Sequence, residues 1–257
     1  MLKGAFLKKY KAEKSFGKAR QAKRKPRKGY STVARSRGIY GQGEMKYFDT
    51  ERSITSLTAS TNWTATEFPP NVGTPNTILC PDQGTAINQR IGREVNVYKI
   101  KVRGLITVGA QTGQNAGDNY SMCRVALVMD TQTNAAQAQG EDIFAAPVTA
   151  SAIQAVSSFQ SLANTGRFRV LKDKWILLED PNIANDTGAT GGIVASGIAR
   201  RFNFSHRFKK PIRVRFNAAN GGTIADIVDN SWAIYANTTF TTLTPQITYQ
   251  ARVSYKE

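Results

Sequence analysis

The chain has little of the chemistry on which most enzymes and metalloproteins depend. Its 257 residues include two cysteines, Cys80 and Cys123, and one histidine, His206. Two thiols without metal-ligand spacing and a single imidazole cannot complete the four nitrogen or sulfur ligands of a structural zinc site. We therefore expect no metal site and no cofactor, and we expect both cysteines to be reduced and buried, as in a chain of intracellular origin.

Long apolar runs are missing as well. No stretch approaches the roughly 18 consecutive apolar residues that would indicate a transmembrane helix. The first residues, MLKGAFLKKYKAEK, lack an apolar core long enough for a secretory signal. We therefore expect no membrane partner.

Acidic residues are almost absent from the first forty positions, which hold one, Glu13, beside 14 lysines and arginines. This segment carries +13 of the chain's formal net charge of +17. Because like charges repel one another and resist compaction, the pattern predicts a flexible basic arm over residues 1–40 that binds a polyanion, followed by a folded domain over residues 41–257. A solubilising tail, an acidic membrane surface and an acidic protein partner are the alternatives.

Nucleic acid is the favoured polyanion, since lysine and arginine neutralise phosphates and release counterions without reading the base sequence. The candidate nucleic-acid-binding residues are Lys3, Lys8, Lys9, Lys11, Lys14, Lys18, Arg20, Lys23, Arg24, Lys25, Arg27, Lys28, Arg35 and Arg37. The densest run would also serve as a nuclear localisation signal. Its cations are Lys23, Arg24, Lys25, Arg27 and Lys28.

Beyond Gly43, apolar and polar residues alternate with a period of two, which is typical of half-buried β-strands. The clearest example runs from Ile247 to Tyr255. Strands are predicted over residues 44–59, 94–109, 120–130, 166–178, 199–207, 211–217, 230–238 and 246–256. Eight strands, long loops and almost no helix predict an all-β antiparallel sandwich or barrel.

Several details follow from the same pattern. The phase of the alternation slips once in the second strand, which predicts a β-bulge near Tyr98 and Lys99. Phe168 and Trp175 are predicted core residues whose truncation to alanine costs several kcal/mol of stability. Short helical pieces are expected around Glu141–Phe144 and within Thr149–Phe159.

The sequence favours no enzyme. His206 alternates with Phe204 and Phe208, which indicates a packed histidine rather than a catalytic one. The glycines at 188, 191 and 192 lack the following Lys-Ser/Thr of a phosphate-binding loop, so a flexible loop is favoured. Asp226 and Asp229 share one loop, but two carboxylates are too few to predict a calcium site.

Five segments of the chain resemble one family. They are Glu44–Thr50, Gln89–Val95 running on to Lys101–Gly104, Arg124–Thr131 with Gln132 and Asn134, Asn164–Lys174, and Pro245–Tyr255. In their order, their spacing and their position behind a basic arm, they resemble the capsid proteins of small circular Rep-encoding single-stranded DNA viruses and, more distantly, those of the satellite tobacco necrosis virus type.

The resemblance implies a single eight-stranded jelly-roll sandwich that assembles with copies of itself into a small T=1 icosahedral shell of 60 subunits. It also implies a basic arm lying inside on a single-stranded DNA genome, and a protein found in the virion and, during assembly, in the host nucleus. Sixty arms would bring about 780 positive charges to the genome. Arg201, Arg207, Arg213 and Arg215 would either face the lumen or form ion pairs between subunits.

Two alternatives come from other classes of protein. One is a β-sandwich that binds DNA as a monomer, which would show a basic stripe on its folded domain and form no closed particles. The other is an enzyme or a carbohydrate-binding jelly roll with an incidental basic tail, which would need a concave pocket with converging polar groups.

Overall fold

The computed structural model describes residues 44–54, 57, 64–65, 77–108, 120–145, 152–179, 198–218, 221–239 and 245–257. The chain divides into two units, Met1–Gln42 and Gly43–Glu257, and every described residue belongs to the second. All fourteen predicted nucleic-acid-binding residues, the predicted localisation signal and the glycine loop at 188–192 lie outside the described residues.

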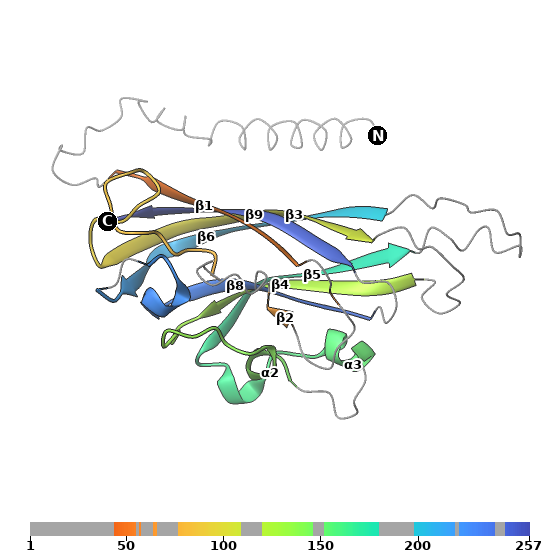
Figure 1. Cartoon of the computed structure of the whole chain (residues 1–257). Helices are drawn as coiled ribbons and strands as arrows, with labels where there is room; N and C mark the ends of the chain where they lie inside the picture. The colour runs from red at the N-terminus through yellow and green to blue at the C-terminus, as the bar shows by residue number, and fades with distance from the viewer. Residues whose placement is uncertain are drawn as a thin grey trace, which may run out of the picture. The chain divides into compact units, whose positions relative to one another are not determined.

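Two antiparallel β-sheets stack face to face (Figure 1). One sheet has the strand order β1-β9-β3-β6-β7, and the other has the order β2-β8-β4-β5. The strands are β1 (Lys46–Ile54), β2 (Thr64–Ala65), β3 (Glu94–Val108), β4 (Tyr120–Asp130), β5 (Phe168–Glu179), β6 (Ile198–Phe216), β7 (Ile227–Asp229), β8 (Ser231–Thr238) and β9 (Gln246–Lys256). Apart from the three-residue β7, four strands of each sheet make the eight-stranded jelly roll, so the predicted fold class is confirmed.

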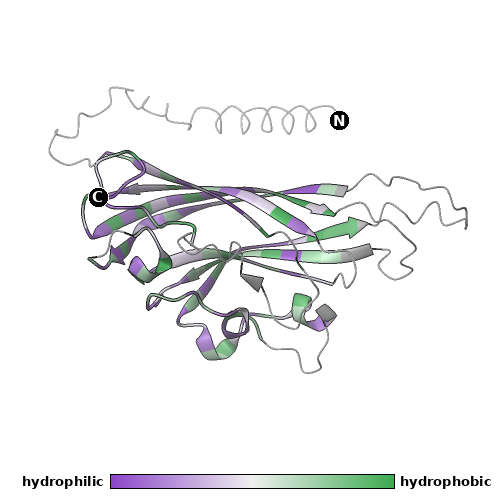
Figure 2. Cartoon of the chain, in the orientation of Figure 1, coloured by the Kyte–Doolittle hydropathy of each residue, from purple (hydrophilic) through white to green (hydrophobic). Residues whose placement is uncertain are grey.

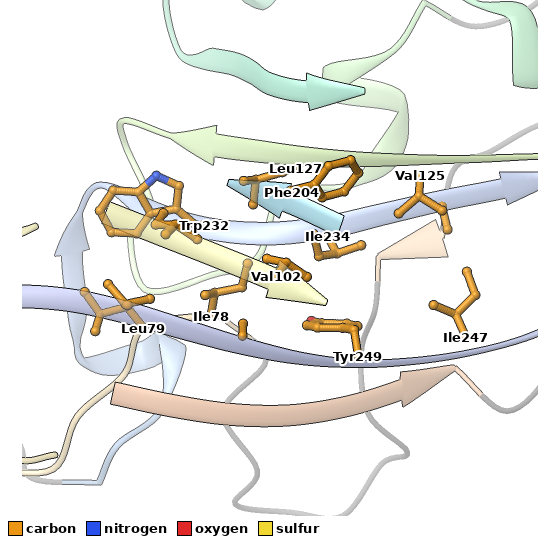
Figure 3. Packing of buried hydrophobic residues seen from close by; sticks show 14 of the residues in the cluster. Ile78, Leu79, Val102, Val125, Leu127, Phe204, Trp232, Ile234, Ile247 and Tyr249 are labelled. Atoms are coloured by element: carbon orange, nitrogen blue, oxygen red, sulfur yellow. The ribbon is translucent and has the colours of Figure 1, made fainter. Parts of the chain in front are cut away.

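Residue alternation decides which side of each strand faces the core (Figure 2). On β9, every second residue from Ile247 to Tyr255 is buried, and the residues between them face away from the core. The buried side chains of the two sheets meet between them, where Val102 and Phe204 of one sheet lie close to Leu127, Trp232 and Ile234 of the other (Figure 3). This shared apolar layer holds the two sheets together.

The predicted bulge is confirmed, because the register of β3 on both neighbouring strands shifts between Val97 and Lys99. The prediction of two separate strands at 199–207 and 211–217 is wrong, since both belong to β6. In its pairing with β3, β6 passes from Arg207 opposite Lys99 to Ile212 opposite Val97. Pro211 therefore lies where this ladder is interrupted, and its missing N–H breaks no hydrogen bond to β3.

The β2-β8-β4-β5 sheet carries a second, smaller core on its outer face. Helices α2 (Gly140–Ile143) and α3 (Ala152–Ser157) lie on the side of this sheet away from the other sheet (Figure 1). Both match the predicted helical pieces, and the segment continues through the 3-10 turn η1 (Leu162–Asn164). The side chains of this core are Ala126, Val128, Ala138, Ile143, Phe144, Phe168 and Tyr235.

The prediction that Phe168 and Trp175 are both core residues is right for the first and wrong for the second. Phe168 is 1% exposed, whereas Trp175 is 45% exposed. Phe168→Ala should lower the free energy of unfolding by about 3–5 kcal/mol. Trp175→Ala should cost about 1 kcal/mol, because it removes chiefly the packing of the ring against the Arg124 guanidinium 4.7 Å above it. Urea unfolding of both variants checks this, and equal losses would contradict the assignment.

Candidate nucleic-acid interface

Cations gather on the outer face of the β1-β9-β3-β6-β7 sheet, where the alternation on β3 and β6 turns polar residues away from the core. Lys99 lies opposite Arg207 of β6, and Lys101 lies opposite Arg252 of β9. We define the cationic face by the outward residues Lys99, Lys101, Arg103, Arg201 and Arg207.

Most carboxylates near this face are already engaged. Arg252 makes two hydrogen bonds to Asp49, at 2.7 and 2.6 Å. At the far end of β6, Arg215 Nε lies 2.6 Å from a carboxylate oxygen of Asp229. Arg213 lies 3.6 Å from Glu94. Among the described residues, none of the five cations of the cationic face forms an ion pair within 4.0 Å.

The four arginines of β6 that the sequence analysis singled out divide into two groups. Arg213 and Arg215 pair within their own chain, which accounts for their charge without a neighbouring subunit. Arg201 and Arg207 are exposed and belong to the cationic face. The choice between a lumen-facing position and ion pairs between subunits stays a prediction for all four arginines.

The cationic face places like charges directly opposite one another. Side chains opposite each other in an antiparallel pair have Cβ atoms about 4.5–5.5 Å apart, and like charges at that distance are destabilising. Lys99 with Arg207 is such a pair, whereas Arg252 opposite Lys101 is already paired with Asp49. A polyanion lying across the strands would turn this repulsion into attraction, and it would release counterions as it bound.

Behind the cationic face the strands are firmly held. Val102 on β3 and Phe204 on β6 are partners in the ladder, and both are at most 5% exposed. A rigid sheet fixes the spacing of the cations, since alternate residues along a strand lie about 6.6–6.8 Å apart. Such an array suits a phosphate backbone and offers no means of reading a base sequence.

Two ion pairs join segments that the family resemblance had singled out separately. Arg124 on β4 donates to both carboxylate oxygens of Asp173 on β5, the shorter bond being 2.6 Å. Asp130 at the end of β4 accepts two bonds of 2.9 Å from Arg167, just before β5. Sequence analysis missed both pairs, although opposite charges on neighbouring predicted strands were a usable signal. Arg124 also donates to the carbonyls of Val156 and Ser158, so it fixes β4 and β5 to the segment that covers them, whereas Arg167 ties the end of β4 to the start of β5.

The residues considered for metal binding or catalysis are engaged in structural contacts. Asp226 accepts a hydrogen bond from the Thr223 backbone N–H at 2.9 Å, as part of a capping box. Asp229 is bound to Arg215. The described residues contain no group of three or more His, Cys, Asp or Glu side chains that could hold a metal ion.

Both cysteines are free and buried, as predicted. Burial raises the pKa of the Cys123 thiol to about 12. Burial, reinforced by Asp226 and Asp82, also raises the pKa of the Cys80 thiol. A thiol held in its protonated form is a poor nucleophile.

His206 is half-buried, with its ring packed edge-on to Phe208 at a centroid distance of 4.7 Å. Burial, and after it the charge of Lys172, lowers its pKa below the usual 6.5. Because the folded state binds the proton less well than the unfolded state, stability should be constant above about pH 6.5 and decline as the pH falls below it. His206→Phe should flatten the melting temperature between pH 7 and pH 5.5, and an unchanged slope in a thermal scan would contradict this.

No helix among the described residues has both the length and the apolar character needed to cross a membrane.

The fold and the cationic face fit both a coat protein and the alternative of a monomeric DNA-binding sandwich, for which a basic stripe was also expected. Comparison with known proteins supports the first. No curated protein matches the chain. The sequence model of the geminivirus coat protein/nuclear export factor BR1 family matches residues 7–257. The chain belongs to this family, and it is a viral coat protein, a structural protein of the virion rather than an enzyme.

Proposed function

We propose that this coat protein packages single-stranded DNA in a T=1 icosahedral shell of 60 copies, with its basic arm and its cationic face both turned toward the genome. The observation that carries the proposal is the set of five cations on one rigid sheet face that form no ion pair among the described residues. Such a surface is poorly suited to contact with an identical surface and well suited to a polyanion.

The arm supplies most of the charge. Residues 1–40 carry +13, whereas the remaining residues together carry +4. We propose residues 1–40 as a nucleic-acid-binding arm and residues 41–257 as the shell domain. The arm condenses the genome by charge alone, so its attraction should weaken steeply as salt rises.

The cationic face acts at shorter range. Its side chains project from strands whose other sides are buried, so binding costs little ordering of the backbone. The outer side of the β2-β8-β4-β5 sheet is instead covered by α2 and α3 (Figure 1). This difference supports an orientation in which the cationic face lines the lumen and the covered sheet faces outward.

The run Lys23–Lys28 is proposed in addition as a nuclear localisation signal, which would bring the protein to the host nucleus for assembly. The two uses of the run are compatible, because import precedes packaging and the same five cations serve both.

Neutralising part of the cationic face tests the proposal. Lys101→Gln combined with Arg103→Gln should reduce the salt dependence of binding to a single-stranded oligonucleotide. For every phosphate that the protein no longer neutralises, the slope of log K against log salt becomes shallower by about 0.7. Fluorescence anisotropy over a series of salt concentrations measures this slope in the full-length protein.

The control removes the same charge from the other sheet. Arg169→Gln combined with Lys172→Gln changes two exposed cations of β5, and it should leave the slope at the wild-type value. Equal slopes for the wild type and the Lys101/Arg103 variant would show that the cationic face binds no phosphates. The arm would then be the only nucleic-acid-binding element in the proposal.

A further inference from the structure

Two large apolar side chains between α3 and β5 are almost fully exposed. Phe159 is 85% exposed and Leu162 is 87% exposed. We name these two residues the loop patch. They do not lie on a loose segment: Ala145 N donates to Phe159 O at 2.8 Å, and Ser161 N donates to Ile143 O at 2.8 Å. Gln160 Nε2 adds a bond of 2.7 Å to Phe168 O.

A second apolar group lies at the end of the sandwich where β1 begins and β9 ends. Ile87 and Ile91 are each 57% exposed, and Tyr47 is 41% exposed. We name these three residues the end patch. Their turn is also firmly held, because Tyr47 N donates to Ile87 O at 3.1 Å, and the carbonyl of Gln89 accepts from both Lys46 Nζ and Tyr255 Oη.

Rigid presentation of exposed apolar side chains favours association over solvation. Burying them against a partner removes apolar area from water without first ordering a flexible loop. Aromatic and large apolar side chains with few charges among them are typical of the centre of a protein interface. A coat protein must bury such surfaces against copies of itself, so the occupant to which these patches point is a second copy of this chain.

Charge indicates how the two patches combine. Glu141 is an exposed residue in the first turn of α2, and the loop patch is hydrogen-bonded to that helix through Ser161 and Asn164. Arg93 is exposed two residues beyond Ile91. Neither Glu141 nor Arg93 forms an ion pair among the described residues. Glu257 also lies beside the end patch, where its carboxylate accepts from Ile91 N at 2.6 Å but is paired with Lys46 at 3.2 Å. The remaining acid beside one patch and the remaining cation beside the other favour contact between unlike patches.

We propose that the loop patch of one subunit docks on the end patch of the next, with Glu141 of the first facing Arg93 of the second. Such a head-to-tail contact joins two different surfaces, so its repetition around a symmetry axis closes a ring. The inference rests on the proposed shell, in which copies of this chain assemble. It adds to that proposal the identity of two surfaces that meet between neighbouring subunits.

Cysteine cross-linking tests the contact directly in assembled full-length protein. The double variant Leu162→Cys/Ile91→Cys, treated with an oxidant and in parallel with a short bis-maleimide, should give a ladder of dimers, trimers and larger species. The native thiols leave a low background, since Cys80 and Cys123 are at most 2% exposed. Each single variant should stay monomeric on a denaturing gel. Dimers from Leu162→Cys alone, or the absence of a ladder from the double variant, would overturn the proposal.

Substitutions give an independent readout. Leu162→Asp and Ile91→Asp should each reduce the yield of particles by about tenfold or more, as disruption of an interface centre does. Val228→Asp, at a 43% exposed position on β7 outside both patches, is the matched control and should assemble normally. Circular dichroism confirms folding in all three. Normal assembly of the Leu162 and Ile91 variants refutes the contact, whereas failure of the wild type to assemble refutes the proposed shell itself.

Discussion

Deleting residues 1–40 should give a folded protein that no longer packages nucleic acid. The deletion removes +13 of the net charge of +17. The remaining cationic face holds too few charges to condense a genome, so we expect nuclease-protected nucleic acid to fall to background. The core between the sheets is built from described residues of Gly43–Glu257, so far-ultraviolet circular dichroism should still show a β-sheet protein.

A permuted arm is the matched control for this deletion. Rearranging the order of residues 1–40 while keeping their composition preserves the charge, and packaging should remain near the wild-type level because phosphate contacts read no sequence. Normal packaging by the truncated protein would contradict the role of the arm. Loss of packaging with the permuted arm would contradict the claim that charge alone suffices.

Arg124→Met should be among the most destabilising substitutions in the shell domain, at about 3–5 kcal/mol of unfolding free energy. Arg124 is 7% exposed, and it binds Asp173 through two nitrogens. It also donates to the carbonyls of Val156 at 2.8 Å and Ser158 at 2.7 Å, at the end of α3. The substitution leaves the Asp173 carboxylate, whose side chain is 30% exposed, and these carbonyl groups without that donor, and the loss costs most at the buried Val156 carbonyl.

Arg252→Met is the control for Arg124→Met, because both arginines bind one aspartate carboxylate through two nitrogens but differ in burial. Arg252 also makes two bonds to one carboxylate, that of Asp49, but the two side chains are 59% and 56% exposed. Water replaces those bonds when the guanidinium is removed, so the melting temperature should stay close to that of the wild type. Urea unfolding of both variants decides the matter, and equal effects would mean that burial of Arg124 does not set its contribution.

Much of the fold could be predicted because apolar and polar residues alternate along a half-buried strand, and this period of two is visible in the sequence. The alternation from Ile247 to Tyr255 predicts β9, and the slip of phase beside Tyr98 predicts the bulge that the register of β3 confirms. The strand that contains Pro211 was predicted as two. The proline is accommodated within β6 because the ladder to β3 is already interrupted there, and only the pairing of distant residues shows this.

The candidate interface was harder to predict, because its members meet only after the strands pair. Lys99 and Arg207 are far apart in the chain and become neighbours through the register of β3 on β6. Trp175 illustrates the same limit: its place in an alternating strand suggested the core, yet it lies on the outer face of β5, where Arg124 covers one side of its ring. Alternation shows that a strand has two faces, and tertiary packing decides which of them is covered.

Electron microscopy of the purified full-length protein, followed by nuclease treatment and extraction of the protected nucleic acid, tests the central claim most directly. We predict closed particles of uniform diameter that release single-stranded DNA only after they are disrupted. Dispersed subunits, or closed particles without protected nucleic acid, would contradict a coat protein that packages its genome through its basic surfaces.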